Sequence, residues 1–246
     1  WERARTAGVS AALIPAVSPG SWERTLACAL PNERWCALGI HPQCLPELTD
    51  RAIEDGLASL EARVRENRAR VVAIGECGFD GSIDLALAPY ERQRRVFAAH
   101  VEVARALDLP LVVHVFRAHG EALRALRTLK LPPRPGVIHS YSGSPDLARD
   151  YLALGFHLAF GGAVTRPNAR KPVTAAREVP LERLLVETDA PDQTPTGVAD
   201  HVRRCEPAHV RVTARRLADI RAMPEGALTE RTAANARALF ALPRSP

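Results

Sequence analysis

The sequence has no hydrophobic run near the roughly 20 residues that a membrane-spanning helix needs. It also has no charged N-terminal stretch followed by an apolar segment, which is the pattern of an export signal. Its five cysteines form an odd set without a CxxC pair or a metal-finger spacing, which favours a reduced compartment. We therefore expect a cytoplasmic protein that does not enter a membrane.

Lysine is also scarce. Lys130 and Lys171 are the only two lysines, so arginine supplies almost all of the 33 basic residues, and the net charge is +5. Guanidinium groups suit phosphate groups because their donors match phosphate oxygens. The basic residues are spread along the chain rather than clustered, which favours a biased composition over a dedicated phosphate-binding surface.

The sequence does contain a regular alternation of short apolar segments and helical patterns, over 246 residues of globular composition. The apolar segments predict seven strands, at Ala12–Val17, Trp35–His41, Val71–Gly75, Leu111–His114, Val137–His139, Phe156–Phe160 and Leu184–Glu187. Helices are predicted over residues 21–30, 50–67, 89–107, 119–129, 145–154, 170–177, 202–222 and 226–240.

This alternation predicts an α/β fold with a parallel sheet that is buried on both faces. No GxGxxG motif opens a helix, so a (β/α)8 TIM barrel is favoured over an open dinucleotide-binding sheet. Seven strands fit such a barrel without its first strand, and we expect roughly 20 or more residues upstream of Trp1 that supply it. Because no linker interrupts the chain, residues 1–246 are predicted to form a single barrel domain.

Metal-capable side chains stand at the ends of five predicted strands. They are His41, Glu76, His114, His139 and Asp189. Any one of them alone would most simply be a rim residue or a helix cap. The carboxyl ends of barrel strands meet at one mouth, so five such residues on five strands predict one site. Imidazoles and carboxylates are ligands of divalent ions, and the sequence therefore predicts a metal site.

Several segments together resemble the TatD family of metal-dependent hydrolases and DNases, which belongs to the amidohydrolase-like barrels. They are Gly39-Ile40-His41-Pro42, Gly75-Glu76-Cys77-Gly78-Phe79-Asp80, Val113-His114, His139-Ser140-Tyr141-Ser142-Gly143-Ser144 and Leu184-Leu185-Val186-Glu187-Thr188-Asp189-Ala190-Pro191. Asp192 and the segment from Phe160 to Thr165 resemble the YjjV-like branch. The resemblance runs from about Trp1 to Phe240 and covers nearly the whole chain.

The resemblance implies two divalent metal ions, Mg²⁺, Mn²⁺ or Zn²⁺, and a catalytic pair formed by Asp189 and Glu76. Glu76 would bridge the two ions, and His114 and His139 would bind the second ion. Asp189 would bind the first ion and take the proton of the attacking water. The family completes the first ion site with a His-x-His motif, which is absent from this sequence and is expected on the upstream strand.

The resemblance also implies residues that contact the substrate or support the metal ligands. His41 and Glu187 match positions of this kind, and Arg117 follows the strand that carries His114. Phe116 is a departure from the family, because many relatives have an arginine two residues after that histidine.

The implied activity is that of a deoxyribonuclease that works from DNA ends with a metal-activated water as the nucleophile. We expect single-stranded or frayed ends to be the better substrates, because the mouth of a barrel is a pocket that admits an end more easily than a duplex interior. Two close cations can activate water and stabilise both the attacking and the leaving oxygen of a phosphoryl group. Two alternatives stay open. One is hydrolysis of an amide, a lactone or an exocyclic amine of a small molecule on the same barrel. The other is a metal-deficient, non-catalytic binding barrel.

Overall fold

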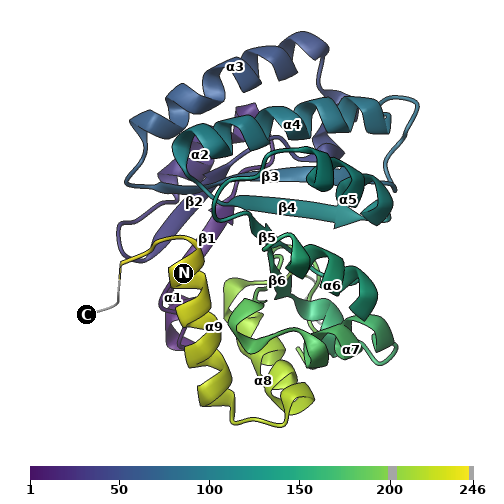
Figure 1. Cartoon of the computed structure of the whole chain (residues 1–246). Coiled ribbons are helices and arrows are strands. Elements are labelled where there is room, and N and C mark those ends of the chain that lie inside the picture. The colour runs from purple at the N-terminus through teal and green to yellow at the C-terminus, as the bar shows by residue number, and fades with distance from the viewer. Residues whose placement is uncertain (199–203, 244–246) are drawn as a thin grey trace. The chain divides into compact units, whose positions relative to one another are not determined.

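The structure is a computed structural model that describes residues 1–198 and 204–243. The chain divides into two compact units, and Figure 1 labels most of their helices and strands. One unit comprises residues 13–137 and the C-terminal residues from 239, and we call it the β1–β5 unit. The other comprises residues 1–12 and 138–238, and we call it the β6–β7 unit.

The β1–β5 unit is built on strands that follow one another in chain order. They are β1 (Ala12–Pro15), β2 (Arg34–Leu38), β3 (Val71–Asp80), β4 (Leu111–Phe116) and β5 (Gly136–Ile138). The pairs β2–β3 and β3–β4 are parallel. Strand β3 is buried at nine of its ten positions, as expected for a parallel strand covered on both faces.

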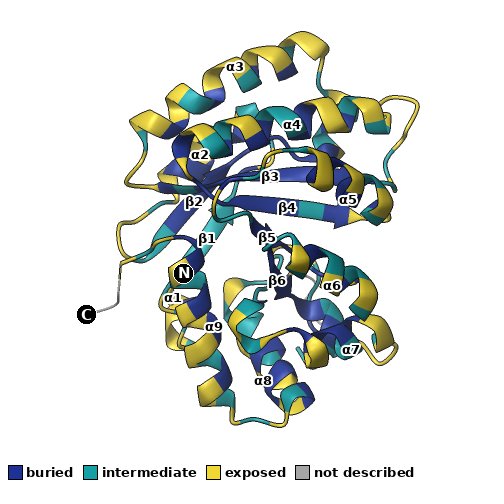
Figure 2. Cartoon of the chain, viewed as in Figure 1, coloured by how far each residue is buried: buried dark blue, intermediate teal, exposed yellow. Residues whose placement is uncertain are grey.

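Helices lie between these strands and shield the sheet from solvent. They are α2 (Trp22–Ala27), α3 (Asp50–Glu66), α4 (Tyr90–Leu107) and α5 (His119–Thr128), with a 3-10 turn at Pro42–Glu47. Helices α3 and α4 run side by side, and Figure 2 shows that each has a buried face and an exposed face. In α4 the buried stripe includes Val96, Phe97, Val101 and Ala104, at the spacing of an amphipathic helix. Among the described residues, no helix is both long enough and apolar enough to span a bilayer.

The β6–β7 unit contains two parallel strands, β6 (His157–Phe160) and β7 (Leu184–Val186). Its helices are α1 (Glu2–Thr6), α6 (Pro145–Ala153), α7 (Arg170–Glu178), α8 (Val210–Arg221) and α9 (Glu225–Leu239). Short 3-10 turns occur at Gly162–Thr165, Leu181–Arg183 and Pro207–His209. The Asn235 side chain donates hydrogen bonds to the carbonyls of Leu181 and Leu184, at 2.7 and 2.9 Å. These bonds attach α9 to the start of β7.

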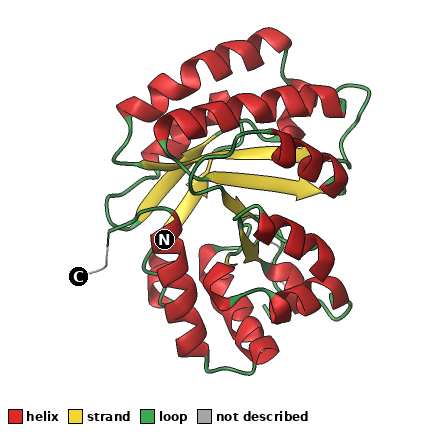
Figure 3. Cartoon of the chain, in the orientation of Figure 1, coloured by secondary structure: helices red, strands yellow, loops and turns green. Residues whose placement is uncertain are grey.

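The structure contains all seven predicted strands, and Figure 3 shows how they alternate with helices. Strand β3 continues to Asp80, five residues beyond the predicted end, because its second half pairs with β4. The helix predicted from residue 202 begins only at Val210, because residues 204–206 are irregular and Pro207–His209 form a 3-10 turn; the start of that prediction falls in 199–203, outside the described residues. That residues 1–246 form one barrel domain stays a prediction.

A substitution at Gly78 tests the close pairing of β3 with β4. Gly78 has a φ of +146°, and an added Cβ would lie 2.0 Å from the His114 carbonyl oxygen. We expect Gly78→Ala to lower the free energy of unfolding by about 2 kcal/mol or more in urea denaturation. Gly120→Ala is the control, since a methyl group added there would meet nothing within 4 Å and alanine favours helix α5. Equal losses in both variants would contradict this account.

A pH-dependent stability is expected from His100, a fully buried residue of α4. Its Nδ1 lies 2.7 Å from the Val96 carbonyl oxygen, and its Nε2 accepts a hydrogen bond from the Ile40 amide at 2.9 Å. Burial lowers the pKa of His100 to about 4. As the pH falls from 6.5 toward this value, only the unfolded chain takes up the proton, so stability falls by up to about 1.4 kcal/mol per pH unit. The free energy of unfolding, measured by urea denaturation at several pH values in this window, should fall less steeply with pH in His100→Gln than in the wild-type protein. The same pH dependence in both proteins would contradict the assignment.

Candidate metal centre

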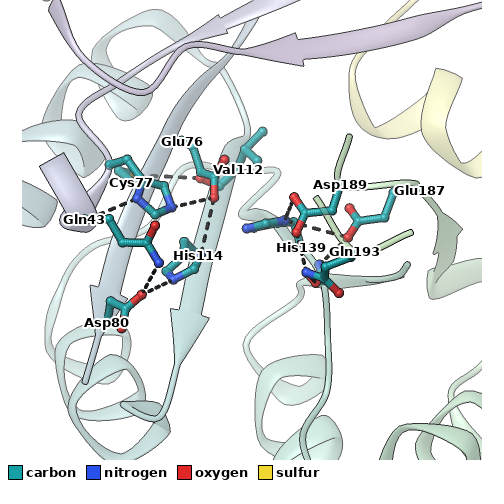
Figure 4. A network of polar contacts seen from close by, with 12 residues as sticks. Gln43, Glu76, Cys77, Asp80, Val112, His114, His139, Glu187, Asp189 and Gln193 are labelled. Atoms are coloured by element: carbon teal, nitrogen blue, oxygen red, sulfur yellow. Dashed lines mark hydrogen bonds and ion pairs between the residues drawn. The ribbon is translucent and has the colours of Figure 1, made fainter. Parts of the chain in front are cut away.

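Three metal-capable side chains of the β1–β5 unit come together, and we call them the His41–Glu76–His114 cluster. Each offers one ligand atom, and these atoms lie within 4.8 Å of one another. His41 Nε2 is 2.9 Å and His114 Nδ1 is 3.4 Å from Glu76 Oε1. His41 and Glu76 are buried, and His114 is nearly so. Figure 4 shows Glu76 and His114 on neighbouring strands with their side chains turned toward one another.

The backbone around the cluster is held by hydrogen bonds to the segment that follows β1. The His41 amide donates to the Val17 carbonyl at 2.8 Å, and the Glu76 amide donates to the Ala16 carbonyl at 3.2 Å. His114 lies opposite Gly78 in the parallel pairing of β4 with β3. These backbone contacts therefore fix the positions of the Cα atoms that carry the three side chains.

Asp80 orients the His114 ring by a hydrogen bond to Nε2, the ring nitrogen that does not face Glu76. Its carboxylate is fully buried and accepts hydrogen bonds from His114 Nε2 at 2.9 Å, from Gln43 Nε2 at 2.8 Å and from Ser82. Burial raises the pKa of Asp80, but the hydrogen bonds from His114, Ser82 and Gln43 outweigh burial and hold it well below its usual range. Asp80 is thus ionised and can only accept, so His114 carries its proton on Nε2 and turns Nδ1 toward Glu76.

His41 turns its other ring nitrogen, Nε2, toward Glu76. Its Nδ1 accepts a hydrogen bond from the Gln43 amide at 3.1 Å, so the ring carries a proton on Nε2. That proton points to Glu76 Oε1, 2.9 Å away. In this arrangement His41 is a hydrogen-bond donor to Glu76 rather than a metal ligand.

The donor set of the cluster fits a divalent cation. His114 Nδ1 and Glu76 Oε1 face each other at 3.4 Å. Both atoms could coordinate one cation, and imidazole with carboxylate is a common ligand pair for Zn²⁺ and Mn²⁺.

A second group of polar side chains lies in the β6–β7 unit. His139 Nδ1 is 3.7 Å from Glu187 Oε1 and 3.8 Å from Asp189 Oδ1. Gln193 Nε2 donates to Asp189 Oδ2 and to the Ser140 hydroxyl. The Ser140 amide in turn donates to Glu187 Oε1. Both carboxylates beside His139 are therefore held in place by hydrogen bonds, as Figure 4 shows for Asp189 and Gln193.

The backbone of this second group is strained at three positions. Ser140, Asp189 and Gln193 have φ values of 47°, 60° and 52°, in the left-handed region. Such a conformation costs about 1–3 kcal/mol for a residue other than glycine and persists only where its surroundings hold it. Here the hydrogen bonds among these residues and Glu187 provide that support.

The structure thus brings Glu76 and His114 together with His41 in one unit, and His139 and Asp189 together with Glu187 in the other. Arg117 lies exposed at the end of β4, with its guanidinium carbon 5.2 Å from the Phe116 ring centroid. The catalytic and metal-binding roles of these residues stay predictions.

Sequence reasoning assigned no role to Asp80, Gln43, Ser140 or Gln193. A signal existed for Asp80, because it lies four residues after Glu76 and so shares a strand face with it once β3 is extended. No local signal existed for Gln43, which uses its backbone amide for His41 and its side chain for Asp80.

Comparison with known proteins gives consistent matches over nearly the whole chain. Residues 1–241 match the family described as TatD related DNase. The chain is 35% identical over 243 residues to the uncharacterized metal-dependent hydrolase YjjV of Escherichia coli K12, covering 98% of this chain and 90% of that protein. It is 34% identical over 251 residues to a Rahnella protein named 3′-5′ ssDNA/RNA exonuclease TatD, again covering 98% and 90%.

Solved structures agree with the sequence matches. The crystal structure of E. coli YjjV, described as a TatD homologue, matches with a TM-score of 0.88 at 32% identity, over 98% of this chain and 90% of that one. An uncharacterized amidohydrolase from Saccharomyces cerevisiae shares the fold, with a TM-score of 0.83 at 17% identity, over 97% of this chain and 91% of that one. These matches confirm the predicted α/β barrel fold class and the resemblance seen in the sequence motifs.

Asp80→Asn tests the orientation of His114. Without the ionised acceptor, the His114 ring is no longer held with Nδ1 toward Glu76, so we expect Mn²⁺ or Zn²⁺ affinity to fall about 10- to 100-fold. Isothermal titration calorimetry measures the affinity, and circular dichroism checks the fold. Asp84→Asn is the control, because Asp84 accepts a side-chain hydrogen bond from an exposed turn amide, that of Ala86, away from the cluster. Equal affinities in the two variants would contradict the role of Asp80.

Proposed function

The chain belongs to the TatD-related DNase family, and we propose that it is a divalent-metal-dependent nuclease that cleaves phosphodiester bonds from the ends of single-stranded or frayed DNA. The observation that carries the proposal is the buried Glu76–His114 pair, with His114 oriented by Asp80. The name of the Rahnella relative supports a single-stranded nucleic acid as the substrate. YjjV, by its name, supports metal-dependent hydrolysis without a stated substrate.

We assign Glu76, His114, His139 and Asp189 as the residues that hold two divalent ions, Mg²⁺, Mn²⁺ or Zn²⁺. When bound, such ions lower the pKa of water and offset the negative charge on the phosphoryl oxygens. The imidazole and carboxylate groups present are suited to these ions.

One of these ligands, Asp189, would also perform the proton transfer, and neighbouring side chains would hold the ligands in place. Asp189 accepts the proton of the attacking water on its carboxylate, and Gln193 holds Oδ2 so that the carboxylate keeps one orientation. His41 donates from Nε2 to Glu76 Oε1 and limits the rotation of that carboxylate. Glu187 is held by the Ser140 amide beside His139.

The proposed location is the cytoplasm. All five cysteines are free thiols in the structure, which is compatible with a reducing compartment.

A nuclease assay tests the proposal directly. End-labelled single-stranded DNA and closed circular duplex DNA are incubated with the protein and Mn²⁺ or Mg²⁺. We expect progressive shortening of the linear strand, little cleavage of the closed circle and no reaction in EDTA. Failure to cleave any nucleic acid, together with hydrolysis of an amide or lactone substrate, would overturn the proposal in favour of a small-molecule hydrolase.

Asp189→Asn and Glu76→Gln test the assigned roles. Each change keeps the size of the side chain and removes a negative charge, so we expect kcat to fall at least about 100-fold while the thermal unfolding curve changes little. The exposed Asp219 of α8 serves as the control, and Asp219→Asn should retain full activity. Near-normal turnover of either site variant at saturating Mn²⁺ would exclude its role.

A further inference from the structure

Phe116 is an exposed aromatic residue next to the metal cluster. Among the described residues, five large apolar side chains are clearly exposed, and Phe116 is the only aromatic one, at 41% exposure. It ends β4, two residues after His114. Because the side chain is partly open to solvent, its ring is available for stacking on a ligand.

The pairing of the strands places Phe116 on the same face of β4 as His114. Side chains alternate along a strand, and the burial pattern agrees, since Val115 between them is buried. Phe116 therefore lies about 6.6 Å farther along the strand than His114. Its carbonyl accepts a hydrogen bond from the Gly81 amide at 2.8 Å, and its partner in the ladder is Asp80.

Arg117 is held against the Phe116 ring. Its guanidinium carbon lies 5.2 Å from the ring centroid, in the range of a cation–π contact. Its backbone has a φ of 52°, and a Cβ at residue 81 would lie only 2.6 Å from its carbonyl oxygen. Glycine at 81 permits this close approach of the two backbones. The approach fixes the position of the chain at the end of β4, where Phe116 and Arg117 lie.

A ring and an adjacent cation at the end of a strand that carries a candidate metal ligand are groups that bind single-stranded nucleic acids. A base stacks on an aromatic face, and a guanidinium pairs with the neighbouring phosphate. We infer that Phe116 stacks on a base of the substrate strand and that Arg117 binds its backbone, beside the bond cleaved at the His41–Glu76–His114 cluster. The inference rests on the proposed nuclease function and adds that a nucleobase, rather than a bare phosphate ester, is recognised.

The experiment is a cycle that combines Phe116→Ala with abasic substrates. Single-stranded oligonucleotides carry one abasic site, moved in turn through the terminal nucleotides, and kcat/KM is measured for each. At one position the abasic site should lower kcat/KM of the wild-type protein about tenfold. Phe116→Ala should show the same loss on the intact strand, mainly through KM, and no further loss at that position. Phe116→Trp should retain the wild-type pattern.

Two further variants separate stacking from general surface effects. Leu87→Ala removes another exposed apolar side chain of the same unit and should leave kcat/KM unchanged. Arg117→Gln should reduce the slope of log KM against log salt concentration by the amount expected for the loss of about one phosphate contact.

The outcomes distinguish this inference from the proposed function. If oligonucleotides are cleaved, but Phe116→Ala and the abasic site each lower kcat/KM and their effects multiply when combined, the stacking role is overturned and the nuclease function stands. Unchanged kcat/KM in Phe116→Ala would show that the ring serves another partner, such as a protein, and would also overturn it. Absence of cleavage of every oligonucleotide would overturn both.

Discussion

The hydrogen bonds that end on the Asp80 carboxylate determine the geometry of the candidate metal centre. An ionised carboxylate without solvent exposure is costly unless donors surround it, and here Ser82, Gln43 and His114 supply them. Because Asp80 can only accept, it decides which nitrogen of His114 carries the proton. Gln43 joins His41 to the same network, since its side chain donates to Asp80 while its backbone amide donates to His41 Nδ1. Both imidazoles thus carry a proton on Nε2, but His41 turns Nε2 toward Glu76 and His114 turns Nδ1 toward it.

The long parallel pairing of β3 with β4 explains why this network can be rigid. Glu76, Gly78 and Asp80 alternate with buried apolar residues along β3, and Gly78 and Asp80 lie opposite His114 and Phe116. The carboxylates therefore come from a strand rather than from a loop, and a ligand carried by a strand keeps its position within narrow limits. The sequence pattern ended this strand at Gly75 because polar and glycine residues follow. Pairing with β4 outweighs that local signal.

Sequence patterns were sufficient for the alternation of strands and helices, since α4 carries a clear helical periodicity and β4 is a short apolar run. They also point to Glu76 and His114, which follow apolar runs, and the structure brings these two side chains within 3.4 Å of each other. They could not show that Gln43 meets Asp80, because that contact joins residues 37 positions apart through a 3-10 turn with no periodic pattern. Gln193 presents the same difficulty, since its bond to Asp189 depends on two residues in the left-handed region of an irregular segment.

The departure at Phe116 has a physical consequence for substrate choice. An arginine two residues after the histidine, which the family resemblance implies, would attract any phosphate ester, because charge pairing does not depend on what the phosphate carries. In this chain the cation is one residue farther along, and a ring takes its place on the face shared with His114. A ring gains little from a phosphate and much from a planar base. With arginine at this position, the strand end would discriminate poorly between phosphate esters. With phenylalanine, it can discriminate between a nucleic acid strand and a small phosphate ester.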